Sequence, residues 1–175
     1  MIHPPLEPIA TGELPLVAAM AGKIWPKVYG QLISPEQIRY MLDLMYSEET
    51  MKSDISSGNA VYCWIRDRAE PVGFCAFGPL TPSKTCEIHK LYVLPERHGK
   101  GYGKKAILSI SRSAREAGSS HLELRVNREN ADAIAFYRAC DFLKHSSDCK
   151  DIGGGFVMDD FIFRKQLDNG RAFSS

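Results

Sequence analysis

The segment RHGKGYGKK (97–105) places three glycines and four cationic side chains within nine residues. It follows IHKLYVL (88–94), a run typical of a strand, and leads into a segment whose apolar residues recur at helical spacing. Glycines allow the backbone to approach a ligand closely, and the free N–H groups at a helix start attract anions. The segment therefore predicts a turn that binds a phosphate group.

Two common phosphate-binding patterns fit this turn poorly. A Walker A loop needs four residues between its glycines, whereas Gly99 and Gly103 enclose three. The run GYGKKA (101–106) does fit the dinucleotide pattern G-x-G-x-x-A, with Glu123 twenty residues after Gly103. However, Glu123 is expected inside a strand, the turn comes in mid-chain after three strands, and no second nucleotide-binding half follows it. Both patterns are therefore set aside.

The periodicity of the chain predicts the elements that must position this turn. Helices are expected over 13–25, from Pro35 with Ser34 as N-cap, over 48–57 and 103–118, and after Asn130. Strands are expected over 6–10, 60–67, 72–78, 86–94 and 121–126, and in two closing segments that start at Phe142 and Gly155. The strand–helix–strand order around the glycines implies a parallel pair. The predicted fold is α/β (an α+β sandwich), with a mixed, mostly antiparallel central sheet of about seven strands flanked by helices on both faces.

Composition and charge argue against several functions. The 175 residues suit one domain, expected over 1–168, with 169–175 as a flexible tail. A formal net charge of +1 argues against nucleic-acid binding. Five cysteines without a C-x-x-C spacing argue against a disulfide framework and a zinc site. Since no apolar run approaches the ~20 residues of a membrane span and no secretory signal is visible, we expect a cytoplasmic protein with no metal and no membrane partner.

Two longer motifs include the turn and a downstream helix. LYVLPERHGKGYGKKAI (91–107) has V-x-P at a strand end followed by the glycine turn, and NRENADAIAFYRACDF (127–142) has N-x-x-A-x-x-F-Y. Together they resemble the GCN5-related N-acetyltransferase (GNAT) superfamily, closely over 60–165 and loosely over the N-terminal helices. The chain departs from the family pattern at His98, where Gln or Arg is usual, and at Asp141, where Gly is usual.

The resemblance implies a GNAT-like fold with acetyl-CoA as the acetyl donor and no metal. Residues 1–59 would form the acceptor side, and 60–165 the acetyl-CoA-binding core. Backbone amides near Leu91 and Val93 are expected to hold the cofactor arm. The expected cofactor contacts are Leu91, Tyr92, Val93, His98, Gly99, Lys100, Gly101, Tyr102, Gly103, Lys104 and Asn130.

The resemblance also implies the residues that move protons. Tyr137 is expected to be the general acid at the departing sulfur. Glu87 and His89 are the candidate bases, and a water chain is the third possibility. Glu87 is preferred because glutamate is frequent at this position in the family, whereas histidine is the residue type that titrates near neutral pH. Strict alternation would put both on one face with Leu91 and Val93, and a bulge would separate them.

The acceptor is expected to be a small primary amine. IWPKVYG (24–30), YMLDLMYS (40–47) and GGGFVMDDFIFRKQL (153–167) resemble segments of bacterial spermidine/spermine-type acetyltransferases. A polyamine is therefore the first choice, and a protein or peptide N-terminus or a lysine is the alternative. The expected walls of the acceptor site are Trp25, Tyr29 and Tyr46, and the expected acids at its rim are Asp43, Glu48, Glu49, Asp159 and Asp160.

Two further hypotheses stay open at this point. A non-catalytic sensor or scaffold that binds acetyl-CoA is the alternative from another functional class, although the presence of Tyr137 and Asn130 argues against it. A homodimer is a second open expectation, because nothing in the sequence decides the oligomeric state.

Overall fold

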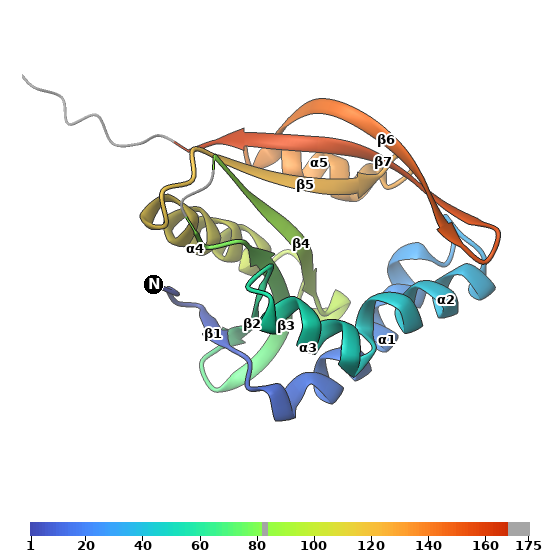
Figure 1. Ribbon diagram of the computed structural model, residues 1–175, viewed down its shortest axis with the longest axis horizontal. Coiled ribbons are helices and arrows are strands. Elements are labelled where there is room, and N and C mark those ends of the chain that lie inside the picture. The colour runs from blue at the N-terminus through green and yellow to red at the C-terminus, as the bar shows by residue number, and fades with distance from the viewer. Residues whose placement is uncertain (82–83, 168–175) are drawn as a thin grey trace, which may run out of the picture.

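The computed structural model describes residues 1–81 and 84–167, and these contain one seven-stranded sheet (Figure 1). The strands are β1 (Leu6–Pro8), β2 (Val61–Asp67), β3 (Glu70–Gly78), β4 (Thr85–Val93), β5 (His121–Asn127), β6 (Leu143–Gly153) and β7 (Phe156–Gln166). Their order across the sheet is β1-β2-β3-β4-β5-β7-β6. Every neighbouring pair is antiparallel except β4 and β5, which are parallel. The predicted mixed, mostly antiparallel sheet is confirmed. The predicted tail, 169–175, lies outside the described residues.

Helices cover both faces of the sheet, as predicted. The helices are α1 (Leu14–Tyr29), α2 (Pro35–Tyr46), α3 (Glu48–Ser56), α4 (Tyr102–Glu116) and α5 (Ala131–Ala139), with short 3-10 helices η1 (Thr11–Glu13) and η2 (Pro95–Arg97). One core packs α1, α2 and α3 against aromatic residues of β2 and β3. A second core packs α4 and α5 against the opposite face. No helix within the described ranges is long and apolar enough to cross a membrane.

The predicted N-caps are confirmed. The Ser34 hydroxyl accepts a hydrogen bond from the Gln37 N–H at 3.1 Å, and Asn130 Oδ1 accepts one from the Ala133 N–H at 3.1 Å. Just after α5, Asp141 adopts a φ of +66°. This left-handed conformation suits glycine better than aspartate, so Asp141 carries a local cost in stability.

The predicted end of the first helix at Trp25 is wrong, because α1 continues through Pro26 to Tyr29. Pro26 has no N–H to donate to the Gly22 carbonyl, but this removes a single bond from the ladder. The helix closes normally, since the Gly30 N–H donates to the Pro26 carbonyl at 3.1 Å. Trp25 and Tyr29 therefore stand one turn apart on the same helix face.

Strand β4 contains a β-bulge at His89. Phe77 of β3 pairs with Ile88, but its neighbour Ala76 pairs with Lys90, which leaves His89 without a partner of its own in this ladder. Before the bulge, the even-numbered residues of β4 face the α4 core. After the bulge they face the core of α1, α2 and α3.

The bulge changes the face of the sheet to which the side chains after His89 point. Leu91 and Val93 pack against the α4 core, whereas Glu87 and His89 line a cavity on the other side of the sheet. Of the two possibilities for this strand, the bulge and not strict alternation is observed, because one extra residue reverses the side to which each following side chain points.

The parallel strands β4 and β5 part beyond the bulge (Figure 1). Thr85–Ile88 pair with His121–Leu124, while β4 continues to Val93 and β5 to Asn127. Within the described residues, no pairing joins the two strands past Ile88 and Leu124. On the side of β5, the backbone of β4 between Ile88 and Val93 therefore faces a gap.

Candidate active site

The glycine turn lies at the end of β4 and forms the start of α4. Gly99 and Gly101 have φ values of +76° and +80°, a conformation that L side chains rarely adopt. A Cβ added at either glycine would meet no atom within 4 Å, so the space above the backbone is open. Helix α4 begins at Tyr102, and the Lys105 N–H is bonded to the Gly101 carbonyl at 3.0 Å. The N–H groups between His98 and Lys105 are left for a ligand, because no side chain of the described residues caps this end.

Two side chains of the turn hold it in place. His98 Nε2 lies 2.9 Å from the Val93 carbonyl, to which it can only donate. The Tyr102 hydroxyl donates to Asp67 Oδ2 at 2.5 Å. Lys100 and Lys104 are exposed and add positive charge beside the turn. Both side chains thus have partners within the protein, and the backbone N–H of His98 also donates to the Pro95 carbonyl at 3.1 Å.

Gly103 brings α4 and α5 close together. A Cβ at this position would stand 2.9 Å from Phe136 Cζ, closer than real Cβ atoms approach a ring carbon. Phe136 is followed by Tyr137, whose ring lies 5.2 Å from that of Phe136 and 5.8 Å from that of Phe142. The third glycine of the turn thus sets the position of the helix that carries Tyr137.

The Tyr137 side chain is packed by its ring, and its hydroxyl has no hydrogen-bond partner among residues 1–81 and 84–167. Burial raises the pKa of Tyr137 above its ordinary value, and the nearby Tyr29 phenol adds to the shift. The hydroxyl therefore keeps its proton at neutral pH. The Asn130 side chain is occupied differently, since its oxygen caps α5.

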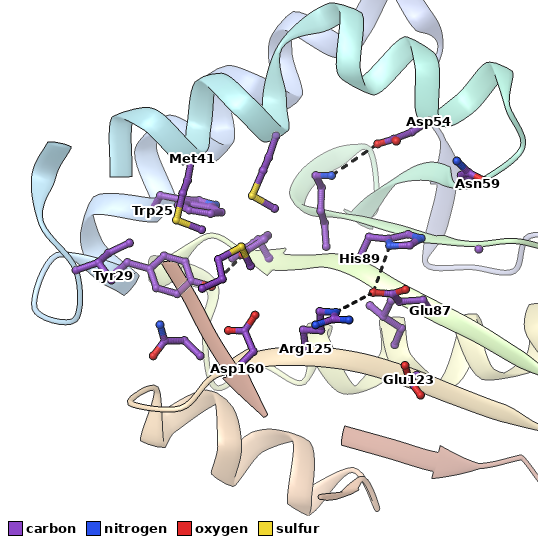
Figure 2. Close-up of a pocket in the computed structure, with 18 of the residues that line it drawn as sticks. Trp25, Tyr29, Met41, Asp54, Asn59, Glu87, His89, Glu123, Arg125 and Asp160 are labelled. Atoms are coloured by element: carbon purple, nitrogen blue, oxygen red, sulfur yellow. Dashed lines mark hydrogen bonds and ion pairs between the residues drawn. The ribbon is translucent and has the colours of Figure 1, made fainter. Parts of the chain in front are cut away.

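A cavity of about 660 Å³ lies on the other side of the sheet from α4 (Figure 2). It is formed by α1, α2 and the strands β4, β5 and β7, with a contribution from the end of α3. The side chains that line it and matter below are Trp25, Tyr29, Glu87, His89, Tyr92 and Asp160.

An aromatic wall closes one end of this cavity. The Trp25 ring centroid lies 4.7 Å from that of Tyr29 and 6.0 Å from that of Tyr92, and the hydroxyls of the two tyrosines are 3.0 Å apart. Tyr46 stands behind the wall, where its hydroxyl accepts a hydrogen bond from Trp25 Nε1 at 3.3 Å. Tyr46 is not among the lining residues, so the structure brings together two of the three aromatics expected at the acceptor site.

Glu87 and His89 lie side by side in the cavity, as Figure 2 shows. His89 Nδ1 is 3.7 Å from Glu87 Oε1, and Arg125 Nε is 3.9 Å from the same oxygen. His89 contributes most to holding the pKa of Glu87 below its ordinary value, burial opposes the shift, and Arg125 adds to it. Glu87 is therefore ionised across the neutral range.

A buried lysine was missed by the sequence analysis. Lys90 is 6% exposed, and its Nζ donates to the Tyr62 hydroxyl at 3.0 Å and lies 4.0 Å from Asp54 Oδ2. Burial lowers the pKa of Lys90, and Asp54 opposes the shift. Lys90 reaches the cavity only because the bulge at His89 turns it inward, and nothing in the sequence marks the bulge.

Of the five acids expected at the rim, Asp160 alone lines the cavity. Asp159 pairs with Arg128 at 2.7 Å, and Glu48 pairs with Lys52 at 2.6 Å. Asp43 lines a separate, smaller hollow. The other acids that line the cavity are Asp54 of α3, Glu87 of β4 and Glu123 of β5, and of these only Glu87 was predicted at the site, as a base.

The fold and the turn together define the class of protein. The sequence model of the Acetyltransferase (GNAT) family matches residues 25–142, which is more than half of the chain. The protein therefore belongs to the GNAT family, whose members take the acetyl group from acetyl-CoA.

Individual relatives are more distant. The chain is 36% identical over 83 residues to the uncharacterized N-acetyltransferase YjgM of Escherichia coli, covering 46% of this chain and 50% of that protein. It is 24% identical over 151 residues to a spermidine N(1)-acetyltransferase of Thermoplasma acidophilum, covering 84% and 90%. The chain spans between 28% and 56% of the length of three related proteins, YjgM among them.

A solved structure shares the fold. The PaiA N-acetyltransferase of Thermoplasma acidophilum, in complex with coenzyme A, superposes with a TM-score of 0.74 at 21% identity, covering 92% of this chain and 97% of that one. At this identity the likeness concerns the fold.

The residues present fit the family's cofactor. The open space above Gly99 and Gly101, the N–H groups at the start of α4 and the exposed lysines suit a pyrophosphate. The unpaired edge of β4 past Ile88 offers backbone groups to an extended arm. Within the described ranges, no group of three or more His, Cys, Asp or Glu side chains could hold a metal ion.

Proposed function

We propose that this protein is an N-acetyltransferase that moves the acetyl group of acetyl-CoA to a small primary amine, with a polyamine as the first choice. The observation that carries the proposal is the gap between β4 and β5. This gap runs from the glycine turn at the end of β4 to the bulge where Glu87 and His89 enter the cavity. A donor held at the turn and an acceptor held in the cavity would meet there.

Acetyl-CoA, when bound, supplies an acetyl group on a thioester whose sulfur is the leaving group. The backbone N–H groups of the turn and of the first residues of α4 would bind its pyrophosphate. The edge of β4 around Leu91 and Val93 would hold the arm, since the backbone groups there have no partner on β5 and, within the described residues, only the Val93 carbonyl of these two accepts from a side chain, that of His98. This binding fixes the reacting atoms at the bulge and lowers the entropic part of the barrier.

Glu87 and His89 would remove the proton from the attacking amine. His89 Nδ1 and Glu87 Oε1 lie 3.7 Å apart, close enough to pass a proton directly or through one water. The Glu87 carboxylate, held ionised by its neighbours, would stabilise a positive imidazole next to it. In this arrangement His89 receives the proton and Glu87 orients it, directly or through water.

Tyr137 would deliver a proton to the leaving sulfur. Burial raises the pKa of Tyr137, so its hydroxyl is a donor and not a base at neutral pH. The Tyr29 phenol, part of the aromatic wall, adds to this shift, which supports a position of the Tyr137 hydroxyl near the gap. Proton-transfer groups would then lie on both sides of the gap.

The acceptor is proposed from the chemistry of the cavity and from one relative. Carboxylates and aromatic rings surround the space, and both attract an alkylammonium group. The spermidine acetyltransferase that matches most of this chain supports the same class. The alternative acceptor, a protein or peptide N-terminus, would need main-chain partners along an open groove.

A CoA-release assay over a panel of acceptors tests the proposal. The panel contains spermidine, a diamine, a monoamine, free amino acids and an N-terminal peptide, with a reaction lacking acceptor as the control. We expect CoA release with the small amines well above that control. CoA release only with the peptide would establish the alternative acceptor. No release above the control with any acceptor would favour a non-catalytic protein that binds acetyl-CoA.

A further inference from the structure

One carboxylate that lines the cavity has no cationic partner among the residues that the structure describes. Three of its four acids have a cationic partner within 4.0 Å: Asp54 with Lys90, Glu87 with Arg125, and Glu123 with Arg164. The carboxylate of the fourth, Asp160, makes no hydrogen bond and no ion pair with any residue in 1–81 or 84–167, and the residue is 4% exposed. A carboxylate that is this buried normally has a partner.

One arginine and two aspartates act electrostatically on the Asp160 carboxylate. Asp160 stands opposite Asn127 of β5 and Asp148 of β6 in the sheet. Arg125 attracts Asp160 through space, but its guanidinium donates to Asp148 at 2.5 Å and also lies near Glu87. Burial, and secondarily the nearby aspartates, raise the pKa of Asp160 above its ordinary value. A cation entering the cavity would supply the missing partner.

Asp160 and the proton-accepting pair occupy different parts of the cavity. Figure 2 shows Asp160 on the side of Tyr29 and Glu87 on the other side of Arg125. The interactions agree with the view, because Asp160 acts electrostatically on Tyr29, while Arg125 interacts with both acids. The reacting amine must lose its proton before it attacks, so a nitrogen that stays charged needs a separate site.

We propose that Asp160 determines acceptor specificity by binding a second, protonated nitrogen of the acceptor while another nitrogen reacts. The proposal rests on the proposed function and deepens it: the preferred acceptor is a small dication, and a monoamine of the same length is a poor one. The rings of Tyr29 and Trp25, which line the same end, add cation–π attraction to this nitrogen.

The test compares putrescine with n-butylamine, which have the same carbon chain and differ by one amine. The variant is Asp160→Asn, which keeps the shape and removes the charge. The matched control is Asp159→Asn, because Asp159 pairs with the exposed Arg128 and is not a lining residue. In the wild type and the control, we expect kcat/KM for putrescine to exceed that for n-butylamine by about 10- to 100-fold, as for a hydrogen bond to a charged group.

In Asp160→Asn this preference should fall to within about threefold, as expected when one such bond is lost. The loss should come mainly from a higher KM for putrescine, with n-butylamine and acetyl-CoA nearly unaffected. The proposal is overturned if the ratio of kcat/KM for putrescine to kcat/KM for n-butylamine is the same in wild type, Asp160→Asn and Asp159→Asn. It is also overturned if the wild type uses the two amines equally well.

A binding measurement separates this proposal from the proposed function. Putrescine is titrated by calorimetry into wild type, Asp160→Asn and Asp159→Asn in the presence of CoA. If no amine is acetylated, the proposed function is wrong. The binding site for the second nitrogen is still supported in that case if Asp160→Asn loses putrescine binding while wild type and Asp159→Asn keep it. Putrescine binding that is equally strong in Asp160→Asn overturns the site, whatever the activity.

Discussion

The glycine turn and the acceptor cavity are built in opposite ways. The turn is contiguous, running from Val93 to Lys104, and its conformation depends on glycines that the sequence displays. The cavity takes its side chains from helices and strands that range from Trp25 to Asp160. The donor side of the site is therefore encoded locally, whereas the acceptor side depends on how distant elements meet.

This difference has a consequence for mutational sensitivity. In the turn, one residue controls the backbone path on which several N–H groups depend, so a single change affects all of them. In the cavity, each side chain contributes its own interaction, and single changes give graded effects. The predictions below test this contrast, beginning with the largest effect.

Gly101→Glu should abolish CoA binding, with Kd raised by roughly 100-fold or more, since it puts a side chain and a negative charge where the pyrophosphate would bind. Calorimetry with CoA measures the effect. Gly101→Ala separates backbone strain from charge, because Gly101 has a φ of +80°. Gly22→Glu, on an exposed position of α1 with open space, is the matched control and should bind CoA normally. Normal binding by folded Gly101→Glu would place the cofactor elsewhere.

Tyr137→Phe should lower kcat by on the order of 100-fold with little change in CoA affinity, because it removes the proton donor and keeps the packed ring. Steady-state kinetics and CoA calorimetry measure the two quantities. Tyr40→Phe is the control, since it removes a hydroxyl that donates to the Ile152 carbonyl and anchors the β6–β7 hairpin. It should cost about 1 kcal/mol of stability and leave kcat within about threefold. Unchanged turnover in Tyr137→Phe would remove this hydroxyl from the mechanism.

Glu87→Gln and His89→Gln should have different pH profiles of kcat/KM. The pKa of Glu87 lies below its ordinary value, so its titration cannot produce a rise of activity in the neutral range. Glu87→Gln should reduce activity by about 10- to 100-fold and leave the shape of the pH profile unchanged. His89→Gln should change the shape of the profile, because it removes the group proposed to receive the proton. The reverse pattern would assign the proton to Glu87.

Asp160→Asn should stabilise the folded protein at pH 7, by on the order of 1 kcal/mol, while it weakens acceptor selection. The folded-state pKa of Asp160 is raised, so the folded state binds its proton more tightly than the unfolded state. The ionised carboxylate therefore destabilises the fold above the folded pKa, and this penalty disappears below the unfolded value of about 3.9. The gain in Tm should be present at pH 7 and absent near pH 3.5. A lower Tm at pH 7 would mean that Asp160 has a stabilising partner.

Several features of the fold were predictable because they depend on neighbours in sequence. The N-caps at Ser34 and Asn130 and the strand–glycine turn–helix unit are local, and each appears where the residue types require it. The parallel pairing of β4 and β5 follows from the helix between them, since a parallel pair needs a crossover. The family motif lies within the same local segments, and the family is confirmed.

The tertiary structure decided the rest. The bulge at His89 arises from the register between β3 and β4, and no residue type in the sequence predicts it. It places Lys90 in the cavity and Leu91 on the opposite face of the sheet. Which acids lack a paired cation was equally hidden, because Asp159 and Asp160 are alike in sequence, whereas in the fold Asp159 pairs with Arg128 and Asp160 is buried without an ion pair among the described residues. The sequence by itself determined the backbone path that suits a phosphate, since that depends on dihedral angles of adjacent residues. The charge balance of the cavity depends on distances between remote side chains, and those distances exist only in the folded chain.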